Sequence, residues 1–257
     1  DHVIARNGTF LQYEIMISPP TYNWIVTNKL YDNSNLTSTV TFPCDGGVDA
    51  GGKDSPAMSS LVVKLAWMDM TGFSDTSTFH TEDLLIYSPS YRVNGGKGPA
   101  TCELKPMGLV GMHIAHKTQK QQAWVWSTFE HSQNAPDCTG LPGGGTGAGD
   151  GGANQSCNDA TQDYNFYPTG KPYDSKCNNV PPSNATSGQT CQNPDNTTGL
   201  GNWCLDNPAA DNTPSTLCRQ VPLSNPAYQP AQDWNAACQT TSGIGVWSNY
   251  QLISTQW

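Results

Sequence analysis

The stretch GLVGMHIAHKTQKQQAWVWSTFEH, residues 108–131, decides the fold that the sequence predicts. Two runs rich in β-branched, apolar and aromatic residues, at 107–118 and 122–131, flank the polar residues 119–121. Runs of this kind around a short polar turn predict an antiparallel β-hairpin. The same stretch holds three of the five histidines and two of the eight tryptophans, so it is also the first candidate for a functional site.

The spacing of the hairpin histidines limits which of them can act together. Side chains alternate between the two faces of a strand, so His113 and His116 are expected on opposite faces, and Glu130 is likewise separated from His131. Cross-strand partners share a face. Whatever the register, one of His113 and His116 therefore lies with Glu130 and the other with His131. One metal ion bound by all three histidines would need a bulge or strand end near Ala115 or Thr118.

Two kinds of site, and a purely structural role at the rim of the core, are compatible with these residues. In a metal site, His131 and the histidine that faces it would bind copper or zinc, with a third ligand from elsewhere such as His80 or an acidic residue. The candidate metal ligands are therefore His113, His116 and His131.

In an acid–base site, Glu130 would orient His113 as a general base beside Lys117 and Thr128. The predicted catalytic set is then His113, Lys117 and Glu130.

The tryptophans of the second run extend the candidate site. Trp124 and Trp126 are two residues apart and should share a face. With Trp67 they could form an apolar core layer, an aromatic platform for a sugar ring, or a surface packed against a cofactor. Cofactor binding is therefore assigned to His116, Trp124 and Trp126.

Other segments with strand character surround the hairpin. They are TFLQYEIMI at 9–17, SSLVVKLAWMD at 59–69, HTEDLLIYSP at 80–89 and the tail GVWSNYQLISTQW at 245–257. TYNWIVTNKLYD at 21–32 is compatible with a short helix or a strand. The expected fold is mainly β, an antiparallel sandwich or barrel-like core with short connections, which the tail rejoins.

Residues 138–220 differ in composition from the rest of the chain. They begin with a Gly-rich run and continue with small polar residues around Cys157, Cys177, Cys191, Cys204 and Cys218. Such a segment buries too little apolar surface to offset its chain entropy, and disulfides could supply about 2–4 kcal/mol each. We expect a β-rich core at 1–137, a long disulfide-stapled, loop-rich insertion at 138–220 and a C-terminal segment at 221–257.

Cysteine content and charge define the expected environment. Nine cysteines indicate an oxidising compartment, secreted or periplasmic, and the odd number leaves at least one free or intermolecular. Five N-x-S/T sequons would carry glycans in a host that glycosylates. A net charge of −9 argues against nucleic acid, and no apolar run approaches the roughly 20 residues of a membrane span. GAGDGGANQ at 147–155 lacks the spacing of a calcium loop.

Several of these stretches together resemble a group of secreted bacterial proteins, some of them labelled as cytochrome c family proteins. They are MGLVGMHIAHKT, WVWSTFEHSQNAPD, VWSNYQLISTQW, FPCDGG, LVVKLAWMDM and FHTEDLLIYSP. The resemblance implies a haem-bearing C-terminal segment or redox partner, with a hairpin histidine as axial ligand and the tryptophans packed on the porphyrin. This chain contains no C-x-x-C-H haem-attachment motif.

Three functions follow. The first is a cytochrome-associated redox or electron-transfer role that uses haem or a metal near the histidine hairpin. The second is a metal-dependent or acid–base hydrolase acting on an extracellular polymer. The third is a glycan-binding or structural surface module. An oligomer is also possible, because exposed edge strands and an unpaired cysteine both permit one.

Overall fold

The computed structural model describes residues 3–36, 40–44, 59–88, 99–118, 120–121, 123–136, 163–168, 214–215, 217, 219 and 229–256. The strands are β1 (Gln12–Ile17), β2 (Leu61–Asp69), β3 (Thr81–Ser88), β4 (Thr101–His116), β5 (Val125–His131) and β6 (Tyr250–Gln256). The helices are α1 (Pro19–Thr27) and α2 (Gln229–Gln239), with short 3-10 segments η1 (Asn33–Asn35) and η5 (Gly245–Asn249).

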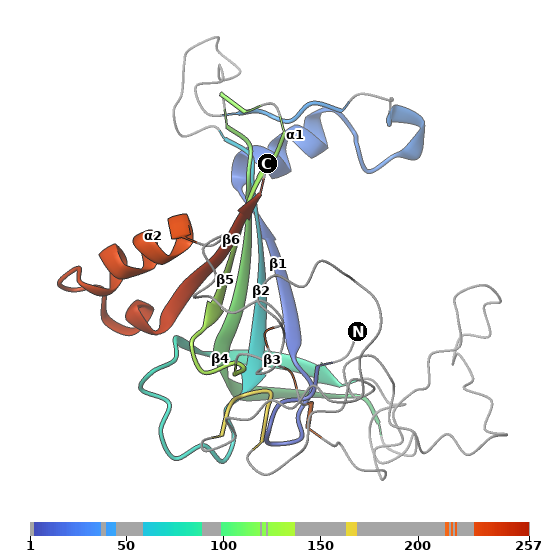
Figure 1. Ribbon diagram of the computed structural model, residues 1–257. Coiled ribbons are helices and arrows are strands. Elements are labelled where there is room, and N and C mark those ends of the chain that lie inside the picture. Colours follow the sequence, from blue (N-terminus) through green and yellow to red (C-terminus); the bar gives the residue numbers. More distant parts are fainter. Residues whose placement is uncertain are drawn as a thin grey trace, which may run out of the picture. The chain divides into compact units, whose positions relative to one another are not determined.

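The strands form one open sheet. Five of them lie in the order β1-β2-β4-β5-β6, and β3 pairs with β4 beside this path (Figure 1). The pairs β3–β4, β4–β5 and β5–β6 are antiparallel. The mainly antiparallel β class is thus confirmed. The expected sandwich or barrel is corrected to an open sheet for the described strands, because closure needs pairing between the first and last strands, which strand-length apolar patterns do not specify.

The predicted insertion at 138–220 lies almost entirely outside the described residues, as do its two boundaries. Its disulfides therefore stay a prediction. Among the described cysteines, Cys44, Cys102 and Cys238 carry free thiols.

The chain divides into two compact units. Unit 1 comprises Asp1–Gln12, Met68–Gly108 and Ser132–Asn225, and unit 2 comprises Tyr13–Trp67, Leu109–His131 and Pro226–Trp257. Strands β1, β2 and β4 each contribute residues to both units.

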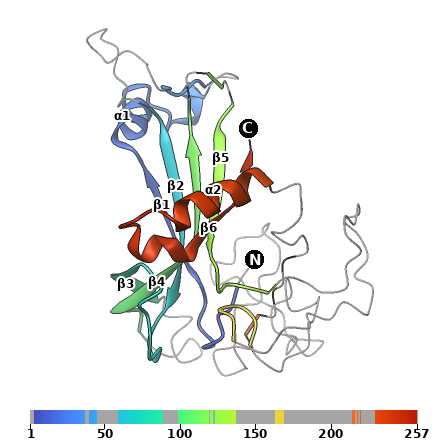
Figure 2. The ribbon, with the colours of Figure 1, turned by 60° about the vertical axis from the view of Figure 1, so that its left-hand side comes forward.

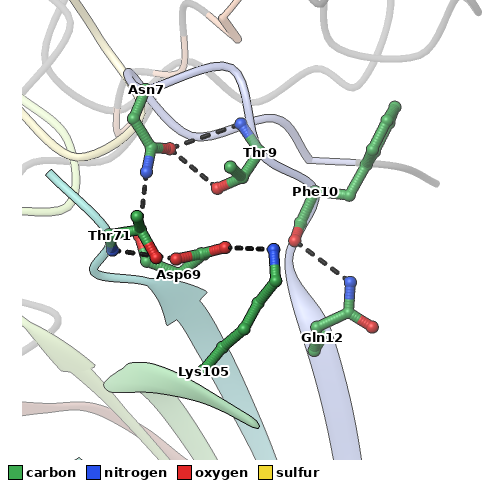
Figure 3. A network of polar contacts seen from close by, with 7 residues as sticks. All are labelled: Asn7, Thr9, Phe10, Gln12, Asp69, Thr71 and Lys105. Atoms are coloured by element: carbon green, nitrogen blue, oxygen red, sulfur yellow. Dashed lines mark hydrogen bonds and ion pairs between the residues drawn. The ribbon is translucent and has the colours of Figure 1, made fainter. Parts of the chain in front are cut away.

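A polar cluster at the end of β2 ties segments of unit 1 together (Figure 3). Asp69, 5% exposed, accepts hydrogen bonds from Lys105 Nζ at 2.9 Å and from the Thr71 backbone N–H at 2.8 Å. The side-chain amide of Asn7 donates to the Asp69 carbonyl at 2.8 Å. Burial by itself would raise the pKa of Asp69, but the hydrogen bonds from Thr71 and Lys105 and the charge of Lys105 outweigh it and lower the pKa. The buried carboxylate is therefore charged at neutral pH.

Buried rings line one face of the sheet in unit 2. Trp67 is 3% exposed, and its Nε1–H donates to Glu14 Oε2 at 3.1 Å. His131 is fully buried and packs edge-on against Tyr250, with ring centroids 5.2 Å apart. The Tyr250 hydroxyl donates to the Leu109 carbonyl at 2.8 Å. Trp67 and Tyr250 thus satisfy their polar atoms within the core, as buried polar groups generally do.

Helix α1 begins at a start signal in the sequence. Ser18 is extended, its hydroxyl accepts a hydrogen bond from the Thr21 N–H at 3.4 Å, and two prolines follow it. The Ser18 N–H donates to the Leu61 carbonyl at 2.9 Å, so the start of the helix is fixed to β2. The segment that the sequence leaves ambiguous is helical up to Thr27.

Helix α2 lies beside β6, the last strand of the sheet (Figures 1 and 2). The Asn235 side chain accepts from the Leu252 N–H at 2.7 Å and donates to the Leu252 carbonyl at 3.0 Å. These bonds occupy backbone groups that an edge strand otherwise exposes. Neither helix in the described part of the chain has the length and apolar character needed to cross a membrane.

Candidate functional site

The register of β4 and β5 decides which hairpin residues meet. His113 lies opposite Thr128, and Gly111 lies opposite Glu130. His116 lies opposite Val125 at the other end of the strand pair from His131. His113 therefore shares a face with Glu130, and His116 shares the other face with His131. This is one of the two arrangements that alternation allows.

The three histidines do not converge on one point. His116 and His131 are separated along the hairpin by six residues, or about 20 Å at 3.3 Å per residue. No register shift occurs between Gly111 and His116 that would turn His113 onto their face. The register therefore brings neither all three histidines nor His116 and His131 together around one ion, and metal binding by His113, His116 and His131 stays a prediction.

Each of the two histidines on the buried face has local partners. The His116 ring contacts the Ser59 hydroxyl, with Nε2 and Oγ 3.0 Å apart, whereas His131 packs on Tyr250. His80, the suggested extra ligand, lies in unit 1 and is 3.4 Å from a Glu82 carboxylate oxygen. Within the described residues, no three His, Cys, Asp or Glu side chains are grouped so as to hold a metal ion.

The tryptophans also divide between environments. Trp67 is buried in the core, whereas Trp126 is 49% exposed and lies opposite Ala115 on the face of His113. Trp124 precedes β5 and packs edge-on against Phe42, with ring centroids 5.7 Å apart. A single layer of three tryptophans is therefore not formed, and Trp126 alone presents a large part of its ring to solvent.

His113 belongs to an exposed row of side chains that crosses four neighbouring strands of unit 2. Its Nδ1 lies 3.0 Å from the Thr128 hydroxyl oxygen on β5. On β2, Lys64 places its Nζ 4.7 Å from the ring centroid of Tyr13 on β1, which is 50% exposed. We call Tyr13, Lys64, His113, Trp126 and Thr128 the polar–aromatic face.

Electrostatics link Lys64 and His113 within this row. His113 is exposed overall, but partial desolvation of its ring lowers its pKa, and the positive charge of Lys64 lowers this pKa further. The imidazole is therefore neutral at neutral pH and can share a hydrogen bond with Thr128 in either direction. Because Lys64 is close to His113, its side chain lies on the same face of the sheet as His113. Trp67, three residues further along β2, lies on the opposite face.

The acid–base site expected from the sequence is only partly assembled. Thr128 contacts His113 as expected, but the cation beside the imidazole is Lys64 rather than Lys117. Lys117 follows the end of β4, where its backbone N–H donates to the Ser60 carbonyl. Glu130 is the next residue along β5 on the same face as Thr128. A lone lysine inside the apolar run LVVKLAWMD is the signal that could have identified Lys64 as facing solvent.

In comparisons with known proteins, no family model, no curated protein and no solved structure matches this chain. The resemblance to cytochrome-associated secreted proteins therefore stays a prediction.

Proposed function

We propose that unit 2 binds a neutral glycan on the polar–aromatic face. The observation that carries the proposal is the pair of half-exposed rings, Tyr13 and Trp126, on the same face as hydrogen-bonding side chains. An aromatic ring presents an apolar surface against which the C–H face of a sugar can stack. Lys64 and His113, on the two strands between the rings, and Thr128, two residues from Trp126 on β5, offer donors and acceptors for sugar hydroxyls.

The dimensions suit an extended ligand. Tyr13 lies on β1 and Trp126 on β5, which are three inter-strand steps apart in the sheet. At 4.7–4.9 Å per step, the rings are separated by about 14 Å across the strands, so a short oligosaccharide rather than one sugar would contact both. The net charge of −9 disfavours an acidic polymer, which leaves neutral glycans as the ligand class.

Binding to neutral polysaccharides tests the proposal directly. The protein would be mixed with insoluble cellulose, chitin and mannan and with their soluble oligosaccharides, and affinity would be measured by depletion and calorimetry. Trp126→Ala and Tyr13→Ala are each expected to weaken Kd roughly five-fold or more, since the loss of one aromatic contact costs about 1 kcal/mol. Trp234→Ala is the matched control, because Trp234 is 66% exposed on α2. Failure to bind any neutral glycan, or equal losses in all three variants, would reject the proposal.

Hydrolysis is a second candidate, favoured by the contact between His113 and Thr128. A neutral imidazole can accept a proton from a substrate hydroxyl or water. However, His113 is exposed, and catalysis generally depends on positioning the substrate and excluding water. Release of new reducing ends from a bound glycan by the unmodified protein, and its loss in His113→Ala, would favour catalysis over binding alone.

The redox function and the disulfide-stapled loops remain proposals that rest on the sequence. A Soret band in the visible absorption spectrum of the native protein would support haem. Peptide mapping under non-reducing conditions would test whether disulfides crosslink 138–220. Secretion or periplasmic export is the setting in which such crosslinks and a glycan ligand are both expected.

A further inference from the structure

The two end strands of the order β1-β2-β4-β5-β6 differ in what covers their outer edges. At β6, the Asn235 amide bonds both backbone groups of Leu252, so α2 covers this edge. At the other end, β1 pairs with β2 on one side and ends the strand order. Natural proteins generally protect an edge strand with charge, proline, a bulge or a covering segment. Strand β1, QYEIMI, contains no proline and no lysine.

The orientation of the β1 backbone follows from one hydrogen bond. The Ser18 N–H donates to the Leu61 carbonyl, so this N–H points toward β2. Backbone groups of successive residues in a strand point to alternate sides. The N–H and C=O groups of Tyr13, Ile15 and Ile17 therefore point away from β2, along the side of β1 that pairs with no other strand among the described residues.

The side chains of these three residues are also exposed. Tyr13 is 50%, Ile15 68% and Ile17 40% exposed, and Met16 on the opposite face is 44% exposed. The one charged side chain of β1, Glu14, accepts a hydrogen bond from the buried Trp67 and so points away from the row of odd-numbered residues. Within the described part of the chain, this edge thus combines backbone groups that have no partner strand with apolar side chains, the combination to which a partner can add a strand.

We propose that β1 pairs antiparallel with β1 of a second copy of this chain, around a two-fold axis at Ile15. A two-fold axis perpendicular to the sheet preserves its faces, so residues of equal parity lie opposite each other. With Ile15 opposite Ile15 of the second copy, Tyr13 lies opposite Ile17, and the outward N–H and C=O groups of all three positions meet their counterparts.

Charge selects this register over its neighbour. Shifting the axis by one residue to Glu14 would place Glu14 directly opposite Glu14 of the second copy, and like charges in that position are destabilising. With the axis at Ile15, each Glu14 lies opposite Met16, and the three exposed apolar positions of one strand lie opposite those of the other. The strand is therefore complementary to itself, which identifies a second copy as the partner. The pairing can be tested separately from glycan binding, although Tyr13 belongs both to β1 and to the polar–aromatic face.

Sedimentation of the full chain over a range of concentrations tests the proposal, with the exposed thiols blocked by iodoacetamide to exclude disulfide-linked dimers. A reversible dimer is expected. Ile15→Lys should weaken the dimer Kd about ten-fold or more, because each charge would lie opposite its equal on the axis. Leu85→Lys is the matched control, because Leu85 is also 68% exposed on a strand, β3 of unit 1, and should leave the Kd unchanged.

Hydrogen exchange of the unmodified protein keeps the test independent of variant folding. The amides of Tyr13, Ile15 and Ile17 should become protected as concentration rises, with the Leu85 strand unaffected. A protein that stays monomeric at high concentration would overturn the proposal. So would a dimer that survives Ile15→Lys unchanged, or β1 amides already protected in the monomer, since another segment of the same chain would then cover the edge.

Discussion

Replacement of Lys105 by methionine probes the ion pair at the end of β2. The Lys105 Nζ lies 2.9 Å from Asp69 Oδ2, and the side chains are 33% and 7% exposed, respectively. Removing one partner of a fully buried pair costs about 3–5 kcal/mol, because an unpaired charge is left behind. Here water screens the exposed lysine, and the Thr71 N–H still bonds the other carboxylate oxygen. We therefore expect Lys105→Met to lower the free energy of unfolding by roughly 1–3 kcal/mol at pH 7.

The lowered pKa of Asp69 determines how the effect of Lys105→Met on stability changes with pH. The folded-state pKa of Asp69 is lowered, so its contribution to stability is present above the unfolded pKa, near 3.9, and is lost as the pH falls through the folded value. Lys105→Met removes the part of the Asp69 pKa lowering that comes from the hydrogen bond and charge of Lys105. The stability difference between the variant and the unmodified protein should therefore narrow below about pH 4.

Urea unfolding followed by circular dichroism at pH 7 and pH 3 measures both effects. Lys64→Met is the matched control, since Lys64 is an exposed lysine on β2 that contacts the Tyr13 ring and should cost less than about 1 kcal/mol. The electrostatic account of Asp69 is refuted if Lys105→Met is as stable as the unmodified protein at pH 7, or if its loss is the same at both pH values.

Three further predictions concern unit 2. Asn235→Ala removes both bonds to the Leu252 backbone. It should cost about 1–2 kcal/mol and create concentration-dependent association through β6, measured by sedimentation; an unchanged monomer–dimer equilibrium would contradict this. Lys64→Gln should raise the pKa of His113 in an NMR titration of its ring protons, because it removes one of the two causes of the lowering; an unmoved pKa would show that burial acts alone. Trp67→Phe should lower the free energy of unfolding by about 1–2 kcal/mol through loss of the bond to Glu14, and an unchanged urea midpoint would contradict this.

The candidate site shows which contacts the alternation of residues along single strands can predict and which it cannot. Alternation along two strands is enough to separate His113 from His116 and to link each with one residue of the Glu130–His131 pair. It does not say which link forms, because that depends on the register, and the register depends on the turn and on packing. Tyr13 and Lys64 join His113 only through pairing with strands far away in the chain, and no spacing within the hairpin predicts them.

Helix α2 is missing from the sequence-based expectation. Pro230, near its start, and the alanine-containing run that follows it are a helix-start signal, but the flanking segments have strand character. Its position beside β6 depends on the two hydrogen bonds between Asn235 and Leu252, 17 residues apart in the sequence.

By itself, the sequence determined that this chain is mainly β and that the hairpin histidines cannot all share one face of regular strands. Those conclusions follow from periodicity, which is a property of each segment alone. Only the tertiary structure decided that the sheet is open, that His131 is buried while His113 faces solvent, and that β1 ends the sheet with its backbone groups outward. These features depend on which strands pair and in what register, and pairing energy is shared between segments that the sequence keeps apart.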